Sequence, residues 1–160
     1  MKQIFLAALL AISGFSLNSL AHEGEHHHEG QHQDGPANPA PVLAGHLAYK
    51  GNTLHLLAYF NPAPKVGGES FLRLEARAAA THQIIELKDK VQVTLWMPSM
   101  NHGSAPTQVE QVLNSEGELQ PGVFNVRNLY FIMPGDWEVR VTLTDSQGHI
   151  ETQKFSMNLF

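Results

Sequence analysis

The sequence predicts an all-β protein, a sandwich of about seven to nine strands, and three observations support this fold class. After Pro41, short runs of alternating apolar and polar residues recur, which is the pattern of strands with one buried face. Glycine, proline and asparagine bound these runs, as expected for tight turns. Helical spacing of apolar residues has little support in the same region. The length of 160 residues is enough for one such domain with an extra segment.

The first 21 residues are expected to be a cleaved signal peptide. Lys2 is basic, residues 4–12 are apolar, and Ser19-Leu20-Ala21 has the small-x-small pattern of a cleavage site. The apolar run is shorter than the roughly 20 residues needed to span a bilayer. The sequence therefore predicts an exported, periplasmic protein that begins at His22 and does not span the membrane.

Residues 22–41 are expected to be a disordered tail, because they include many histidines and acids and no large apolar residue. Tracts of this kind bind Cu(II) or Zn(II) loosely. The alternative is a solvated polar leader that merely tolerates histidine. The histidines that would collect metal are His22, His26, His27, His28 and His32.

The domain is expected to span residues 42–160. Gly51-Asn52 suits a two-residue hairpin loop between its first two strands. That loop pairs residue 48 with 55 and residue 46 with 57, so His46 and His55 should be diagonal neighbours on one face, within reach of a shared ion. A solvated or hydrogen-bonded pair is the favoured interpretation. In chain order, the strands are expected at residues 42–50, 53–60, 70–79, 83–87, 90–97, 107–113, 123–132, 137–145 and 150–158.

The most informative stretch places Met97, Met100 and His102 within six residues, where the strand over 90–97 ends at Pro98. Thioethers are soft and neutral and imidazole is a borderline donor, so this set suits Cu(I). Alternation puts Met97 on the apolar face, where a core role is the alternative. The same alternation puts Trp96 on the polar face, where its indole could make a cation–π contact with a bound cation.

A second methionine loop, Met133-Pro134-Gly135-Asp136, has proline and glycine in the positions that a type II turn requires. Met133 would supply a further thioether if this turn lies at the same rim as Met97. The alternative is that Met133 only enters the turn. Trp137, which follows, is expected to be buried in the core because apolar residues continue from it at period two.

Several motifs of the sequence resemble the YtkA-like domain, which is related to FixH. They are the connector 60–67 with its P-x-x-G, the M-P-x-M loop 96–103, Gly122-Val123-Phe124, and the M-P-G-x-W turn 132–139. The resemblance covers roughly residues 50–145 and implies an immunoglobulin-like β-sandwich. FixH proteins are membrane-anchored and associated with copper delivery or cation pumping during assembly of respiratory oxidases. This chain, by contrast, is expected to carry only a cleavable signal.

The sequence therefore predicts an exported copper-binding protein, a chaperone or metal buffer. The alternative is an immunoglobulin-like interaction module that docks a membrane metalloprotein, transporter or respiratory complex. Nucleic acid is not an expected partner, because the formal charge is −5 and the ten Lys and Arg are scattered. With no cysteine, metal binding must use His, Met and carboxylate. Because no nucleophile triad, phosphate loop or paired-carboxylate motif stands out, the protein is expected not to be an enzyme.

Overall fold

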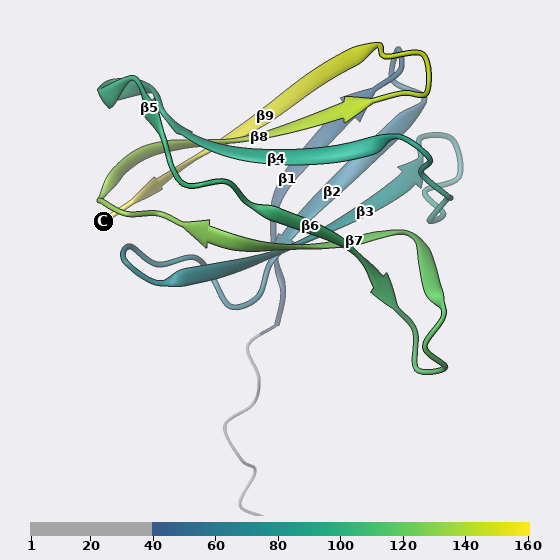
Figure 1. The fold of residues 1–160 in the computed structure, drawn as a ribbon, viewed down its shortest axis with the longest axis horizontal. Coiled ribbons are helices and arrows are strands. Elements are labelled where there is room, and N and C mark those ends of the chain that lie inside the picture. The colour runs from purple at the N-terminus through teal and green to yellow at the C-terminus, as the bar shows by residue number, and fades with distance from the viewer. Residues whose placement is uncertain (1–39) are drawn as a thin grey trace, which may run out of the picture. The chain divides into compact units, whose positions relative to one another are not determined.

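Two antiparallel sheets face each other in the computed structural model, which describes residues 40–160 (Figure 1). One sheet has the strand order β1-β2-β3-β7-β6, and the other has the order β5-β4-β8-β9. The predicted all-β sandwich is therefore confirmed, whereas the predicted signal peptide and residues 22–39 of the predicted histidine tail lie outside the described residues. The strands are β1 (Val42–Tyr49), β2 (Leu54–Phe60), β3 (Glu69–Ala78), β4 (Lys90–Met97), β5 (His102–Gly103), β6 (Gln108–Leu113), β7 (Leu119–Tyr130), β8 (Gly135–Thr144) and β9 (Ile150–Leu159), with a short 3-10 turn, η1 (Pro98–Met100).

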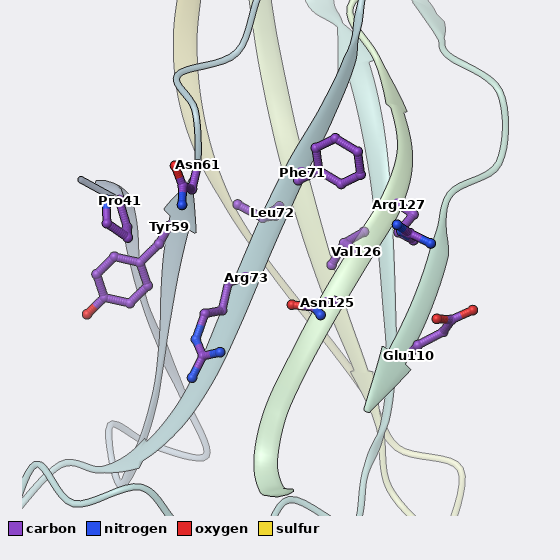
Figure 2. Close-up of a pocket in the computed structure, with 10 residues that line it drawn as sticks. All are labelled: Pro41, Tyr59, Asn61, Phe71, Leu72, Arg73, Glu110, Asn125, Val126 and Arg127. Atoms are coloured by element: carbon purple, nitrogen blue, oxygen red, sulfur yellow. The ribbon is translucent and has the colours of Figure 1, made fainter. Parts of the chain in front are cut away.

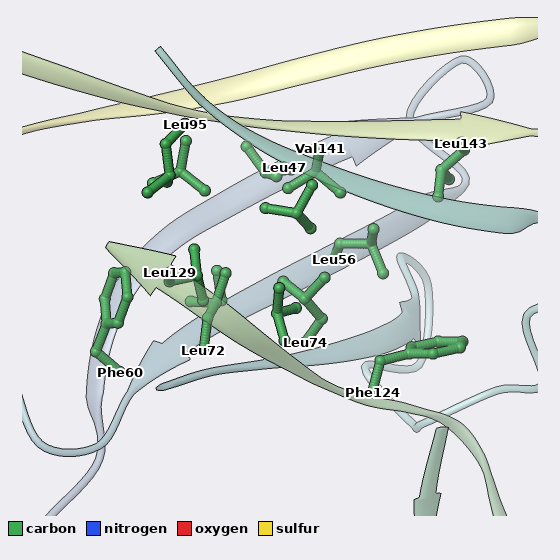
Figure 3. Packing of buried hydrophobic residues seen from close by; sticks show 14 of the residues in the cluster. Leu47, Leu56, Phe60, Leu72, Leu74, Leu95, Phe124, Leu129, Val141 and Leu143 are labelled. Atoms are coloured by element: carbon green, nitrogen blue, oxygen red, sulfur yellow. The ribbon is translucent and has the colours of Figure 1, made fainter. Parts of the chain in front are cut away.

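The core fills the space between the two sheets (Figure 3). It forms because strand residues alternate between the two faces, so every second side chain of β2, for example, is buried. Trp137 is fully buried, as the sequence predicts. No helix in residues 40–160 has the length and apolar character needed to cross a membrane. The core side chains that Figure 3 labels are Leu47, Leu56, Phe60, Leu72, Leu74, Leu95, Phe124, Leu129, Val141 and Leu143.

The first and last strands, β1 and β9, lie side by side and join the two sheets along one side of the sandwich. Only glycine fits at position 45, because the ring of Phe155 occupies the place where a Cβ would be. The Tyr49 hydroxyl donates a hydrogen bond of 2.7 Å to the carbonyl of Val141, and its burial raises its pKa well above the usual value. The N-terminal strand is therefore fixed to the C-terminal half of the chain.

The predicted strand over residues 83–87 is wrong. The segment makes only an isolated bridge between Ile84 and Arg77. β3 pairs with β7 as far as Glu75 and Val123, and the last residues of β3 bond instead to this segment, with Ile85 N–H donating to the carbonyl of Ala76 at 2.9 Å. The segment is short because it fills only the edge of β3 that β7 leaves free.

The remaining differences from the predicted elements are small. The first hairpin has the predicted register, with Ala48 opposite His55, but its loop is longer than predicted, since pairing ends at Tyr49 and Leu54. Within this loop, Lys50, Gly51 and Asn52 all have positive φ. β8 begins at Gly135, two residues before the predicted start. The elements η1 and β5 were not predicted. Both belong to the segment 97–103, which carries Met97, Met100 and His102 and which we call the methionine loop.

A buried carboxylate on the outer face of the second sheet is held by two cations. Glu138, only 8 % exposed, accepts hydrogen bonds from Lys154 and, at 2.7 Å, from Arg140. The hydrogen bond from Lys154, followed by the one from Arg140, lowers the pKa of Glu138 below the usual 4.5. The folded state therefore favours the ionised form.

We expect the free energy of unfolding to fall as the pH drops below about 4.5, the usual glutamate pKa, through the lower folded-state values. In that range the unfolded chain binds more protons than the folded one. Glu75 adds to the effect: its burial raises its pKa, but hydrogen bonds from Arg77 and Arg73 outweigh this and lower it. Urea unfolding across this pH range measures the slope, which should be smaller in Glu138→Gln. Equal slopes in the two proteins would exclude Glu138 as a source of acid sensitivity.

Candidate metal centre

The methionine loop folds back on itself at one end of the sandwich (Figure 1). β4 ends at Met97, η1 makes a tight turn, and β5 returns beside β4. Asn101 closes the turn with φ of +53°, and its N–H donates to the carbonyl of Pro98 at 3.2 Å. The left-handed conformation suits asparagine, so the turn that the sequence predicts at Pro98 and Asn101 is formed.

The fold-back places Met97 directly opposite His102 across the β4–β5 pair. Opposed residues of an antiparallel pair project to the same face, with Cβ atoms about 4.5–5.5 Å apart. Met97 is 2 % exposed and belongs to the core, whereas His102 is half-buried at the edge of the sheet. Met97 is therefore a core residue, which was the alternative interpretation of this methionine, and it also lies beside the imidazole of His102.

The second methionine loop reaches the same end of the sandwich. Met133 is half-buried and packs against the core, and its carbonyl accepts a 3.0 Å hydrogen bond from Nε1 of Trp137. Gly135 has φ of +133°, and a Cβ added to it would lie 2.7 Å from Cε of Met97. The second methionine loop therefore lies at the end of the sandwich where β4 ends at Met97, which we call the rim. This is the position that Met133 needs if it is to be a further donor.

A hydrogen bond that sequence reasoning missed joins the two loops: the Ser99 hydroxyl donates to the carboxylate of Asp136. This hydrogen bond lowers the pKa of Asp136 and keeps it ionised. The sequence offered one signal for this bond: Ser99 directly follows the proline of the first methionine loop, and Asp136 directly follows the glycine of the second. The bond holds η1 against the start of β8 and places a negative charge at the rim.

Met100 and Trp96 do not join the other donors in the same way. Met100 is 57 % exposed on η1 and points away from the core. Trp96 lies on the face opposite Met97, as predicted, but its ring is covered by the guanidinium of Arg140, with Cζ 4.8 Å from the ring centroid. The cation–π partner of Trp96 in the structure is therefore an arginine. The tail histidines lie outside the described residues.

The chemistry of the rim fits a soft monovalent ion better than a hard or borderline divalent one. In the part of the chain that the structure describes, no three His, Cys, Asp or Glu side chains are grouped to hold a metal. A metal at the rim would therefore need thioether sulfur besides His102. Two thioethers and an imidazole form a neutral, soft set that suits Cu(I), whereas zinc sites use Cys, His and carboxylate.

A separate hollow of about 650 Å³ lies on the outer face of the five-stranded sheet (Figure 2). The guanidinium carbon of Arg127 lies 5.6 Å from the centroid of the exposed Phe71 ring. None of the predicted metal donors lines it. The lining residues are Pro41, Tyr59, Asn61, Phe71, Leu72, Arg73, Glu110, Asn125, Val126 and Arg127.

In a comparison with protein families, a YtkA-like profile matches residues 50–142, more than half of the chain. The chain belongs to the YtkA-like family. The matched part of the YtkA-like domain runs from the loop of the first hairpin into β8, and it includes Met97, Met100, His102 and Met133. Searches of curated proteins and of solved structures found no match.

Proposed function

We propose that this protein is an exported, periplasmic copper-binding protein, a chaperone or metal buffer, that holds Cu(I) at the rim. Met97, His102 and Met133 would hold the ion, and Met100 would be an exposed donor for its capture. The observation that supports this most is the opposition of Met97 and His102 across β4 and β5, with the Met133 loop packed beside Met97.

The rim has the properties that reversible copper handling requires. The thioethers stay neutral at every pH, and the ionised Asp136 adds a favourable negative charge nearby. Met100 is exposed on η1, so its thioether could bind a copper ion from solvent first and transfer it to the buried donors. Bound copper would supply no reaction here. The residues would only bind and release it, which agrees with a non-enzymatic role.

The proposal extends to the parts around the rim. Residues 1–21 would direct export, and the tail 22–41 would collect Cu(II) or Zn(II) weakly through its histidines. The domain 42–160 would be an immunoglobulin-like sandwich. A relation to FixH would make a membrane metalloprotein or transporter a natural recipient of the copper.

The second candidate function is a docking module without specific copper binding. It is favoured by the exposed Met100, since thioether side chains adapt to varied partners. The hollow beside Phe71 also carries tyrosine and arginine, which are common at the centres of protein interfaces. On this hypothesis the partner would be a membrane or respiratory protein.

We expect the full chain with its five tail histidines replaced by asparagine to bind about one Cu(I) per molecule. His102→Ala and Met133→Leu should each weaken the binding about tenfold or more, because each removes a donor that holds the ion, whereas Met100→Leu, which removes only the exposed capture donor, should weaken it less. Met97→Leu should also weaken it while lowering stability by less than about 1.5 kcal/mol, since the volume is conserved. Competition with a chromophoric Cu(I) chelator measures the affinities, and urea unfolding measures stability.

Met157→Leu is the matched control. Met157 is also a half-buried methionine packed against the core, but it lies on β9 and is not a predicted donor. Its substitution should leave the Cu(I) affinity unchanged. If the parent takes up no Cu(I), or if all four rim variants bind like the parent, the copper proposal fails and the docking function replaces it.

A further inference from the structure

A second pair of metal-ligating side chains lies on the outer face of the five-stranded sheet. His46 of β1 and His55 of β2 are diagonal neighbours, because His46 pairs with Leu57 and His55 pairs with Ala48. Nε2 of His46 lies 2.9 Å from Nδ1 of His55, and the ring centroids are 4.4 Å apart. The pair uses none of the donors at the rim, so it is a separate feature of the molecule.

Asn52 determines the tautomer of His55. Nε2 of His55 lies 2.8 Å from Oδ1 of Asn52. An amide oxygen can only accept, so Nε2 of His55 carries the proton, and the neutral ring presents the lone pair of Nδ1 to His46. A histidine that ligates a metal through one ring nitrogen usually donates its other N–H to an oxygen in this way. The orienting contact of a metal ligand is therefore already present.

The geometry points to a two-imidazole site for a divalent transition-metal ion, Cu²⁺ or Zn²⁺, held by Nε2 of His46 and Nδ1 of His55. The proton on Nε2 of His46 moves to Nδ1 of the same ring, so both rings stay neutral, and the ion lies beside the line that joins the two nitrogens, with both rings turned so that their lone pairs point at it. With metal–nitrogen bonds of about 2.0–2.1 Å, neighbouring ligands are about 2.9 Å apart at a square-planar ion and about 3.3 Å apart at a tetrahedral one. The observed nitrogen separation of 2.9 Å therefore needs little adjustment.

The surroundings leave the pair open to an ion from solvent. His46 is exposed and His55 is half-buried, so water can complete the coordination. Arg77 lies opposite His55, but its charge is offset by the ion pair with Glu75, and it also donates to the carbonyl of His82 at 2.7 Å. Imidazole suits copper and zinc in their divalent states, whereas the rim offers thioethers for Cu(I). The two sites thus select different ions.

The test uses the full chain with the five tail histidines replaced by asparagine, which leaves His46, His55, His82, His102 and His149. Zn²⁺ alone is added, and the imidazole nitrogens are followed by two-dimensional NMR. At about one equivalent, Nε2 of His46 and Nδ1 of His55 should show the shifts of zinc ligation. His55→Gln and His46→Gln should each weaken zinc binding about tenfold or more, whereas His82→Asn, at an exposed position with positive φ, should not.

Asn52 variants test the orienting contact without altering either ligand. Asn52 has φ of +67°, which glycine adopts readily, so Asn52→Gly removes the acceptor without strain. It should weaken zinc binding about tenfold, and Asn52→Asp should retain the affinity because it keeps an acceptor. Unchanged zinc affinity in both His46→Gln and His55→Gln overturns the proposal. So does zinc ligation that appears at His149 or His102 with no shift in the pair.

Discussion

Replacing Trp137 with alanine is expected to lower the free energy of unfolding by about 3–5 kcal/mol. Trp137 is fully buried and meets the ring of Phe131 edge to face, with centroids 5.5 Å apart. Alanine would leave a cavity between the sheets and would also remove the N–H that donates to the carbonyl of Met133. Urea unfolding monitored by circular dichroism measures the loss.

Trp137→Phe separates packing from hydrogen bonding. It keeps an aromatic ring in the core but leaves the Met133 carbonyl without its partner, at a cost of about 1–3 kcal/mol. This variant should also weaken Cu(I) binding if Met133 is a ligand, because the loop would lose its anchor. A loss below about 1 kcal/mol for Trp137→Ala would contradict the central position of this side chain.

Gly122→Ala should cost about 4 kcal/mol, for two reasons that act together. Gly122 has φ of +72°, in the left-handed region that alanine avoids. The added Cβ would also overlap the carbonyl oxygen of Ile85, and it would lie 3.0 Å from the carbonyl carbon of that residue. Relief requires the backbone of residues 83–87 to move away from β7.

Gly117→Ala is the matched control, because Gly117 has a similar φ of +81° and open space where the Cβ would be. It should cost only about 1–2 kcal/mol, the cost of the left-handed conformation alone. The difference between the two variants in denaturant midpoint then measures the steric clash with Ile85. If the two variants lose the same free energy of unfolding, the backbone of residues 83–87 moves away from the added Cβ at no cost and does not support β7.

Features that depend on near neighbours in the chain could be predicted from the sequence. Gly51-Asn52 and the flanking alternation predicted the register that makes His46 and His55 diagonal neighbours. Pro98 and Asn101 similarly predicted that the methionine loop turns back. Both inferences succeed because turn conformation and the two-residue period of a strand are local properties.

Features that depend on which strands meet could not be predicted in this way. Residues 83–87 have the composition of a strand, but β7 already occupies most of the β3 edge that they would need. The partner of Trp96 is Arg140, which comes close only because β4 pairs with β8. The Ser99–Asp136 hydrogen bond likewise spans 37 residues of sequence.

The contact between the first and last strands has a consequence for how the chain folds. Hydrogen bonds beside this contact join Tyr49 of β1 to Val141 of β8, and Lys50, which follows β1, to Glu151 of β9, across 92 and 101 residues of sequence. Such distant pairings pay a large loop-closure entropy before they contribute, which places folding in the range of milliseconds to seconds. A chain still emerging from a ribosome cannot complete its core until β9 is free, so its apolar sheet faces stay open to chaperones or to aggregation until synthesis ends.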